Sequence, residues 1–363
     1  MLVRGKNFSL DGIRNILLIQ LGDIGDVVLT FPSIKALHEN FPQANLIVAV
    51  REKARELIED CPWATGVISI NKDKRRLARE IAYQKDFLLR LRRYDFDLAI
   101  DMRTGTRGAI LSLLSGANRR IGFYADDGKL WRNRVFTQLT LLGYTPGQYV
   151  AQYYSSVLHT LNIKTQMRPL LEVSPEKRQK AAALFRNEKV PLDRPVIAVH
   201  PFSLWKYKEW GMDKYIQLIN RIGSKYELPV IITGSPDERE RAATLEKMCG
   251  KLVYNFAGKT SIAMLAAILD ACGLFIGVDS AGMHIAGAVG TPTISIFGPS
   301  SPASWAPRGK RHTVVHKNLP CVPCRQKGCN NSEMSRCLDE LSAEEVIPVV
   351  DTKVLEIETT LNQ

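Results

Sequence analysis

Short runs of apolar, often β-branched residues alternate along the chain with amphipathic stretches. Each run is almost continuously apolar, as expected of strands in a parallel sheet that helices cover on both faces. The alternation of such runs with helical patterns predicts two α/β domains built from βαβ units. The predicted strands are 15–21, 45–50, 67–70, 97–101, 196–200, 229–233, 274–278 and 292–297.

Residues 164–194 are rich in Lys, Arg, Glu and Pro and separate the two sets of strands, so we expect a hinge there. The expected division is a first Rossmann-like domain over 1–180, a second over 190–341, and a C-terminal helix over 342–363. Ser342 and Glu345 form a capping box that starts this helix, which we expect to pack back on the first domain. Open α/β sheets bind ligands at the carboxyl ends of their strands, so a cleft between facing domains is the expected site.

The first predicted strand runs into Gly22-Asp-Ile-Gly-Asp26 and then into a helical pattern. A glycine-rich turn at this place suggests a phosphate loop, but Asp23 and Asp26 would repel a diphosphate. The loop is therefore expected to present a carboxylate, and Asp26 could accept a proton from an attacking hydroxyl. The alternative is that both acids only cap the helix.

In the second half, the strand 274–278 leads into Asp279-Ser-Ala-Gly-Met-His284 and a helix of small residues. Ser280 and the free amides of Ala281 and Gly282 suit an anion at a helix N-terminus. His284 could add a donor, and Asp279 could accept a hydrogen bond from a sugar hydroxyl. The alternative for His284 is a buried histidine with a structural role.

Two other strand ends in this half carry candidate ligand groups. Ser203, Lys206 and Lys208 follow the strand 196–200, and a lysine there could neutralise a leaving diphosphate without a metal ion. Asp237 and Glu238 follow the strand 229–233 and could meet a ribose, although exposed lysines and acidic helix starts are also common without any ligand.

The chain has 363 residues, 45% hydrophobic and 24% charged, which excludes a disordered protein. No apolar run is long enough to span a bilayer, and acidic residues interrupt the first apolar stretch where a signal peptide would continue, so a cytoplasmic protein is expected. The net charge of +12 suits nucleic acid, an anionic membrane surface or a phosphorylated substrate. Basic residues gather in 72–93, which is either such a surface or a solvated helix face.

Four cysteines are spaced C-x2-C-x4-C-x7-C, at Cys321, Cys324, Cys329 and Cys337. In a reducing compartment this clustering favours a metal over disulfides, and four thiolates would suit a structural Zn²⁺. The spacing fits no standard zinc ribbon, so reduced thiols are the expected state and structural zinc is the alternative.

With these residues placed, the chain resembles glycosyltransferase family 9, the ADP-heptose:lipopolysaccharide heptosyltransferases, over nearly its whole length. It looks most like the type III subgroup and next like type II. Three stretches carry the resemblance: Ile16-Leu-Leu-Ile-Gln-Leu-Gly-Asp-Ile-Gly-Asp26, Phe275-Ile-Gly-Val-Asp-Ser-Ala-Gly-Met-His284 and Gly290-Thr-Pro-Thr-Ile-Ser-Ile-Phe-Gly-Pro299.

The resemblance implies a GT-B fold and an inverting transfer of heptose from ADP-heptose that needs no metal or other cofactor. It implies that Asp26 is the base that deprotonates the acceptor hydroxyl, and that the donor is bound by the second half of the chain. Lys206 remains an alternative to Lys208 for the diphosphate. The implied donor-binding residues are Ser203, Lys208, Glu238, Asp279, Ser280, Ala281, Gly282 and His284.

The implied acceptor is the inner core of lipopolysaccharide on lipid A, met by a peripheral protein at the inner leaflet of the inner membrane. Asp23, Arg103, Arg107 and Arg120 are the candidate acceptor-binding residues, the arginines for its phosphates. The alternatives are a GT-B nucleotide-sugar transferase with another donor and a non-catalytic, basic nucleic-acid-binding protein. The chain has no recognised nucleic-acid-binding motif.

Overall fold

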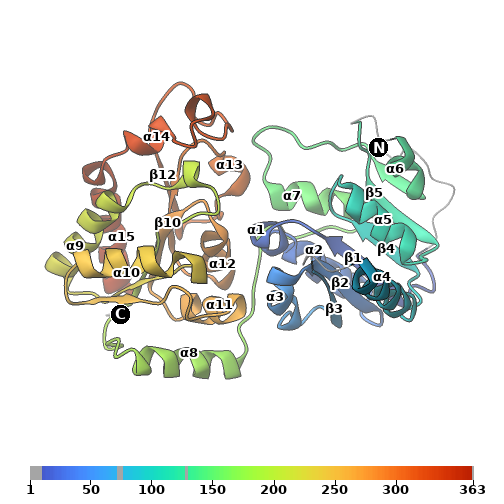
Figure 1. Cartoon of the computed structure of the whole chain (residues 1–363), viewed down its shortest axis with the longest axis horizontal. Coiled ribbons are helices and arrows are strands. Elements are labelled where there is room, and N and C mark those ends of the chain that lie inside the picture. Colours follow the sequence, from blue (N-terminus) through green and yellow to red (C-terminus); the bar gives the residue numbers. More distant parts are fainter. Residues whose placement is uncertain (1–9, 72–76, 127–129, 362–363) are drawn as a thin grey trace. The chain divides into compact units, whose positions relative to one another are not determined.

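The computed structural model describes residues 10–71, 77–126 and 130–361 (Figure 1). The chain divides into two compact units, Met1–Leu170 and Leu171–Gln363. Each unit is an α/β domain with its own parallel sheet and its own buried core.

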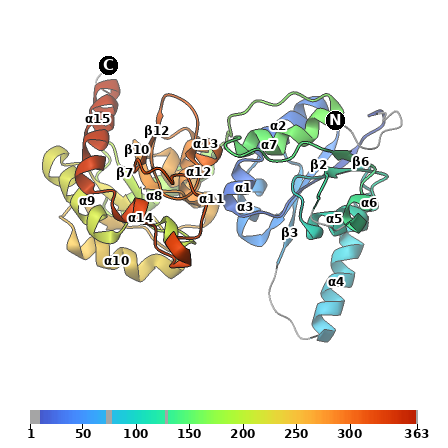
Figure 2. The same ribbon diagram turned by 90° about the horizontal axis from the view of Figure 1, so that it is seen from above.

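The first unit contains a six-stranded parallel sheet in the order β3-β2-β1-β4-β5-β6. Its central strand is almost fully buried, because residues 16–19 are 0% exposed. Helices α2 and α7 are neighbours, and so are α4, α5 and α6 (Figure 2). The strands are β1 (Asn15–Gln20), β2 (Asn45–Arg51), β3 (Gly66–Ile70), β4 (Leu98–Asp101), β5 (Arg119–Phe123) and β6 (Gln138–Thr140). The helices are α1 (Ile24–Val28), α2 (Phe31–Asn40), α3 (Arg55–Glu59), α4 (Leu77–Arg92), α5 (Thr106–Leu114), α6 (Leu130–Val135) and α7 (Val150–Ser155), with 3-10 turns η1 (Glu52–Ala54) and η2 (Ser156–Leu161).

The second unit repeats this arrangement in a sheet of order β12-β11-β10-β7-β8-β9. Its strands are β7 (Ile197–His200), β8 (Val230–Ile232), β9 (Val253–Asn255), β10 (Leu274–Val278), β11 (Thr293–Phe297) and β12 (His312–His316). The helices are α8 (Pro175–Asn187), α9 (Met212–Tyr226), α10 (Arg239–Met248), α11 (Ile262–Asp270), α12 (Ala281–Val289), α13 (Pro302–Trp305), α14 (Arg336–Asp339) and α15 (Ala343–Leu361). Three 3-10 turns are η3 (Lys206–Lys208), η4 (Pro236–Glu238) and η5 (Cys329–Asn331).

Both sheets have the strand order of a doubly wound Rossmann fold, as the alternating pattern predicted. In this topology the order of the strands reverses between β1 and β4 in the first sheet, and between β7 and β10 in the second. Ligands of open α/β sheets bind beyond the carboxyl ends of the strands at this reversal. Each unit therefore offers one such place, independently of the other.

All eight predicted strands are present, and the described residues form four more, namely β5, β6, β9 and β12. The segment 164–194 contains helix α8, which begins at the cap residue Ser174 and packs against α11 of the second unit. The boundary between the units lies before it, between Leu170 and Leu171.

Helix α15 belongs to the second unit. One of the two hydrogen bonds of the predicted capping box is present, since Ser342 N donates to the Glu345 carboxylate at 2.9 Å. Its apolar side chains, among them Val346, Val350 and Val354, are part of the second core, and α15 packs on α9. Among the described residues, no helix is both long and apolar enough to cross a membrane.

Candidate active site

Asp26 lies directly beyond the carboxyl end of β1, at the third position of α1. Asp23 is the N-cap residue of this helix, and its backbone N donates to Asp26 Oδ2 at 2.8 Å. Gly22 allows the tight approach, because a Cβ atom there would lie 2.3 Å from Asp26 Oδ2. The Gly-Asp-Ile-Gly-Asp sequence therefore fixes a carboxylate at the edge of the first sheet.

Two side chains from distant parts of the first unit also bind the Asp26 carboxylate. Arg103, which follows β4, donates from Nη1 to Asp26 Oδ2 at 2.8 Å. The hydroxyl of Tyr154, on α7, donates to Asp26 Oδ1 at 2.5 Å. The Asp26 side chain is 11% exposed, so these hydrogen bonds are largely shielded from water.

Burial and the Asp26 charge affect both partners. Burial raises the pKa of the Tyr154 hydroxyl well above its usual value, and the negative charge of Asp26 raises it further, so Tyr154 stays a proton donor. Burial acts to lower the pKa of Arg103, but its interactions with Asp26, Tyr154 and Asp23 together outweigh burial and the net pKa is raised. Asp26 is thus held between one fixed cation and one neutral hydroxyl.

A buried ion pair between Arg132 and Asp101 holds the backbone of Arg103. Arg132, on α6, is fully buried and donates from Nη2 to Asp101 Oδ2 at 3.3 Å and to the carbonyl oxygen of Arg103 at 2.8 Å. Asp101, the last residue of β4, accepts a hydrogen bond from Arg103 N at 3.1 Å. Burial raises the pKa of Asp101 to about 7, although Arg132 favours its charged form.

Sequence reasoning missed Tyr154, Arg132 and Asp101 as parts of this site. Only Asp101 had a usable signal, since it is an acid at the end of a strand. Tyr154 and Arg132 reach the site through the tertiary fold from helices α7 and α6.

The expected acceptor-binding residues fall into different places. The Asp23 carboxylate pairs with Arg51 at 2.9 Å and Lys53 at 2.8 Å. Burial would raise its pKa, but these cations lower it. Arg107 is exposed on α5. Arg120 lies at the amino end of β5, where its guanidinium donates to backbone carbonyls of residues 135 and 117, away from the strand ends that carry Asp26 and Arg103.

The basic stretch 72–93 is only partly described, since residues 72–76 lie outside the described part of the chain. Its remainder contains the whole of α4, where Arg90 pairs with Asp86 at 2.9 Å. An ion pair of this kind is typical of a helix face that is exposed to solvent.

In the second unit, the residues expected to bind the donor meet at the strand reversal. Lys208 Nζ lies 2.7 Å from Asp279 Oδ2, and His284 Nε2 lies 4.0 Å from Asp279 Oδ1. Asp279 is 5% exposed, so burial acts to raise its pKa. The charge and the hydrogen bond of Lys208, with smaller contributions from neighbouring side chains, together outweigh burial, and the net pKa is lowered. Asp279 is therefore a buried carboxylate that fixes the lysine.

The N-terminus of α12 has the features of an anion site. Ser280 is its N-cap residue, but its side chain caps no backbone amide. The Ser280 Oγ atom is buried and has no hydrogen-bond partner among the described residues. Leaving a buried hydroxyl unsatisfied is costly, so a ligand that hydrogen-bonds to Ser280 and to the amides of Ala281 and Gly282 would be favoured.

The other expected donor-binding residues flank this group. Ser203, after β7, accepts at Oγ from Trp205 N at 3.3 Å. Lys206 is exposed on η3, whereas Lys208 on the same turn is only 20% exposed and reaches Asp279. Glu238, after β8, accepts at Oε2 from Ser235 N at 2.6 Å and so closes a capping box.

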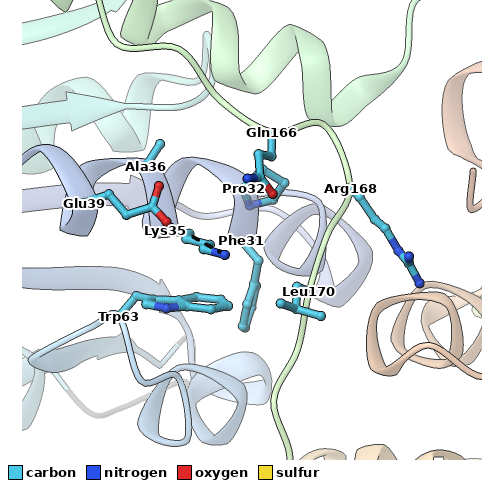
Figure 3. Close-up of a pocket in the computed structure, with 9 residues that line it drawn as sticks. All are labelled: Phe31, Pro32, Lys35, Ala36, Glu39, Trp63, Gln166, Arg168 and Leu170. Carbon is cyan, nitrogen blue, oxygen red and sulfur yellow. Dashed lines mark ion pairs between the residues drawn. The ribbon is translucent and has the colours of Figure 1, made fainter.

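Each unit has a pocket that is lined by residues other than these candidates. In the first unit, a pocket between α2 and residues 166–170 has a volume of about 20 Å³, which holds about one water molecule (Figure 3). There Lys35 Nζ lies 5.3 Å from the centre of the Trp63 ring and 3.8 Å from Glu39. In the second unit, a hollow of about 1,030 Å³ adjoins Val196 and Gly273, which precede β7 and β10. It therefore lies at the opposite edge of that sheet from Lys208 and Asp279.

The four clustered cysteines form no disulfide in the described part of the chain; Cys321 and Cys329 are exposed, Cys324 is half-buried and Cys337 is buried. Burial raises the pKa of Cys337 to about 11, and the neighbouring Cys324 and Cys329 add to the rise. Within the described ranges, no group of three or more His, Cys, Asp or Glu side chains is arranged to hold a metal ion.

Proteins named as heptosyltransferases are similar in sequence to this chain over most of its length. Escherichia coli lipopolysaccharide heptosyltransferase 3 is 29% identical over 291 residues, which cover 78% of this chain and 83% of the relative. Pseudomonas aeruginosa lipopolysaccharide heptosyltransferase 1 is 25% identical over 341 residues, covering 91% and 92%.

Solved structures share the fold. The E. coli ADP-heptose lipopolysaccharide heptosyltransferase II superposes with a TM-score of 0.78 at 20% identity, over 95% of this chain and 99% of that one. A family 9 glycosyltransferase from Veillonella parvula gives 0.81 at 21% identity, over 94% and 97%. The two Rossmann-like domains are those of the GT-B fold, as expected from the sequence.

The model of glycosyltransferase family 9 (heptosyltransferase) matches residues 86–335, which is well over half of the chain. This match runs from α4 of the first unit to the loop before α14 in the second, and so includes Arg103, Lys208 and the Asp279–His284 segment. The chain therefore belongs to glycosyltransferase family 9 and is a transferase enzyme.

Proposed function

We propose that the protein transfers a heptose from ADP-heptose to the inner core of lipopolysaccharide, with inversion at the anomeric carbon and without a metal ion. The observation that carries this proposal is the Asp26 carboxylate, which three donors hold at the carboxyl edge of the first sheet. The relatives named lipopolysaccharide heptosyltransferases support the donor and the acceptor class.

Asp26 is the proposed general base. Its Oδ2 accepts two hydrogen bonds and its Oδ1 accepts one, so among the described residues a lone pair of Oδ1 remains for a proton. The acceptor hydroxyl oxygen attacks the anomeric carbon, the bond from that carbon to the diphosphate oxygen breaks, and the hydroxyl proton passes to Asp26. Attack from the face opposite the leaving ADP inverts the configuration.

The second unit is proposed to bind the donor. The diphosphate would accept hydrogen bonds from Ser280 and the amides of Ala281 and Gly282, and Lys208 would neutralise the charge that develops on the leaving group. A fixed lysine and a helix N-terminus can supply this stabilisation in place of a metal ion. Ser203, Glu238, Asp279 and His284 are proposed to contact the rest of the nucleotide sugar.

The acceptor is proposed to be the lipid A-core oligosaccharide at the inner leaflet of the inner membrane, with the enzyme as a peripheral, cytoplasmic protein. Arg103 and Arg107 are the proposed contacts to its phosphates, because guanidinium groups bind phosphate in a bidentate way. Arg120 is a weaker candidate, since its guanidinium is bound to backbone carbonyls.

The first test compares the wild type with Asp26→Asn. We expect the variant to lose at least about a thousandfold in turnover of ADP-heptose, as expected when a general base is removed, and to keep its rise in melting temperature with ADP. Near-normal turnover by Asp26→Asn would refute the assignment of the base. If UDP or GDP but not ADP stabilises the wild type, the donor is another nucleotide sugar.

A further inference from the structure

The outer face of helix α5 is unusual for a soluble protein. Gly108, Ala109, Leu111 and Ser112 are buried against the first unit. The exposed positions include Arg107, Ile110 and Leu113, and the last two are 43% and 50% exposed. Positions three residues apart lie on the same side of a helix, which in a soluble protein is normally polar. Here that side carries one arginine and large aliphatic residues.

Helix α6 is the neighbour of α5 (Figure 2). Its exposed residues are similar in kind to those of α5. Trp131 is 46% exposed and Arg134 is exposed, three residues apart, while Arg132 and Val135 are buried. Neither α5 nor α6 contains an acidic residue. Two adjacent helices thus present a large apolar side chain beside an arginine.

Helix α4 packs next to α5 and extends the same surface. It presents Leu89, which is 53% exposed, together with exposed Lys85 and Arg92. Its described acidic side chain, Asp86, is paired with Arg90 at 2.9 Å. We call this surface the basic-apolar face, and define it by Lys85, Leu89, Arg107, Ile110, Leu113, Trp131 and Arg134.

We infer that the basic-apolar face docks the first unit onto a bilayer that contains anionic lipids. Arginine and lysine would pair with lipid phosphates, while Ile110, Leu113 and Trp131 would enter the boundary between headgroups and acyl chains. Tryptophan is favoured at this depth because its ring is apolar and its N–H can stay hydrated. This inference rests on the proposed function, in which the acceptor is anchored in such a membrane.

The mixture of side chains favours a bilayer over the other partners of a basic surface. A nucleic acid would pair with the arginines but would leave Ile110 and Leu113 against charged phosphates and sugars. A protein interface concentrates its apolar side chains in a central core with a polar rim. Here the apolar side chains alternate with cations, which a fluid layer of anionic headgroups over an apolar interior can satisfy together.

Vesicle sedimentation tests the inference with the full chain. We expect the wild type to bind vesicles of phosphatidylcholine with phosphatidylglycerol, and to bind weakly to phosphatidylcholine alone. The variant Ile110→Ser/Leu113→Ser/Trp131→Ser should lose about tenfold or more of this binding, because its apolar anchors are gone. The control Leu192→Ser/Met248→Ser/Leu355→Ser changes residues of the second unit that are 49%, 57% and 53% exposed, and should bind like the wild type.

The variant Arg134→Glu tests the electrostatic contribution to vesicle binding by itself. It should weaken binding to anionic vesicles and reduce the dependence of binding on salt, with the melting temperature unchanged.

If the triple variant in the first unit sediments like the wild type, the proposed docking surface is wrong. Equal loss in the control variant also overturns it, and so does tight binding of duplex DNA without vesicle binding.

Turnover separates this inference from the proposed function. With a water-soluble, delipidated core acceptor, the wild type and the triple variant should be equally active. With acceptor embedded in anionic vesicles, the triple variant should be about tenfold slower, in line with its weaker binding. Absence of wild-type turnover on both acceptors would refute the proposed function, whereas equal rates of both proteins on vesicles would refute the docking surface alone.

Discussion

At the scale of single residues, the Asp26 carboxylate is held by groups that come from four parts of the first unit: its own helix, the end of β4, and through Arg132 and Tyr154 the helices α6 and α7. Such a carboxylate is oriented before any substrate arrives, which reduces the cost of reaching the reactive geometry. The partners of Asp26 should therefore affect the chemical step more than substrate binding.

Tyr154→Phe tests this expectation for a positioning residue. Loss of its hydrogen bond to a charged group should lower kcat about tenfold to a hundredfold, while KM for the donor changes little. The control is Tyr153→Phe, since Tyr153 stacks on Phe123 with ring centres 4.5 Å apart. A Tyr154→Phe enzyme with normal kcat, or with a raised KM only, would contradict the positioning role.

The buried Lys208–Asp279 pair predicts two separable effects. Lys208→Met should destabilise the protein by about 3 kcal/mol because it leaves a buried charge unpaired, and should weaken ADP binding about tenfold or more. The double variant Lys208→Met/Asp279→Asn removes both charges, so we expect it to regain stability but not ADP affinity. Calorimetric melting and ADP titration measure the two quantities.

Lys206→Met is the matched control for this pair, since Lys206 is exposed on the same turn. It should leave melting temperature and ADP affinity close to wild type. If Lys206→Met instead loses ADP affinity and Lys208→Met keeps it, the diphosphate is bound by Lys206.

At the scale of helices and strands, most strands that the sequence revealed are buried, and the exception is the half-buried edge strand β3. The central strands β1, β4, β7 and β10 are continuously apolar because they are covered on both faces. The strands that were missed carry weaker patterns: β6 and β9 have three residues each, β12 is half-buried, and β5 begins with Arg119 and Arg120. Three of these four lie at sheet edges, where burial no longer dictates the residue type.

The residues of the candidate site were likewise predicted where a local sequence pattern marks them and missed where none does. Asp26 and the Asp279–His284 segment follow apolar strands directly, so local sequence located them. Tyr154 and Arg132 lie on short helices whose sequences resemble ordinary amphipathic segments. Their roles depend on contacts between residues far apart in the chain, for example Tyr154 with Asp26, which no local pattern encodes.

The attachment of α15 to α9 predicts a pH effect. Asp351 lies 2.9 Å from Arg221 and 2.8 Å from Lys225. Burial alone would raise its pKa, but hydrogen bonds to these cations lower it to about 2. Because the pKa is lower in the folded state, the stabilisation is complete above the ordinary value near 3.8 and is lost as the pH falls toward 2.

Asp351→Asn should therefore lower the free energy of unfolding by about 1 kcal/mol or less at neutral pH, the range of partly exposed ion pairs, and by progressively less as the pH falls from near 3.8 to 2 and below. Urea unfolding at a series of pH values measures the difference. Asp193→Asn is the control, since Asp193 forms no ion pair with a described residue. A difference that persists unchanged at pH 2 would show that the ion pairs are not its source.

At the scale of the whole molecule, each unit has its own sheet, its own core and its own group of candidate ligand residues. All the proposed donor-binding residues, from Ser203 to His284, lie in Leu171–Gln363. The fragment 171–363 should therefore fold alone and show a rise in melting temperature with ADP, but should transfer no sugar because Asp26 is absent. A folded fragment that ignores ADP, beside a full chain that binds it, would contradict the assignment of the donor site.

The second unit can complete its fold only after helix α15 has been synthesised. Helix α15 is the last element of the second unit along the chain, yet Val346, Val350 and Val354 fill the same core as Ile197, the first residue of β7. The first unit can fold while later residues are still being translated, because domains fold as units from the N-terminal side. The second unit cannot complete its core until α15 has left the ribosome. Ribosomes that stall or terminate shortly before α15 would release a chain with a folded Asp26 site and an exposed apolar surface where α15 packs on α9, which is the kind of product that cellular proteases remove.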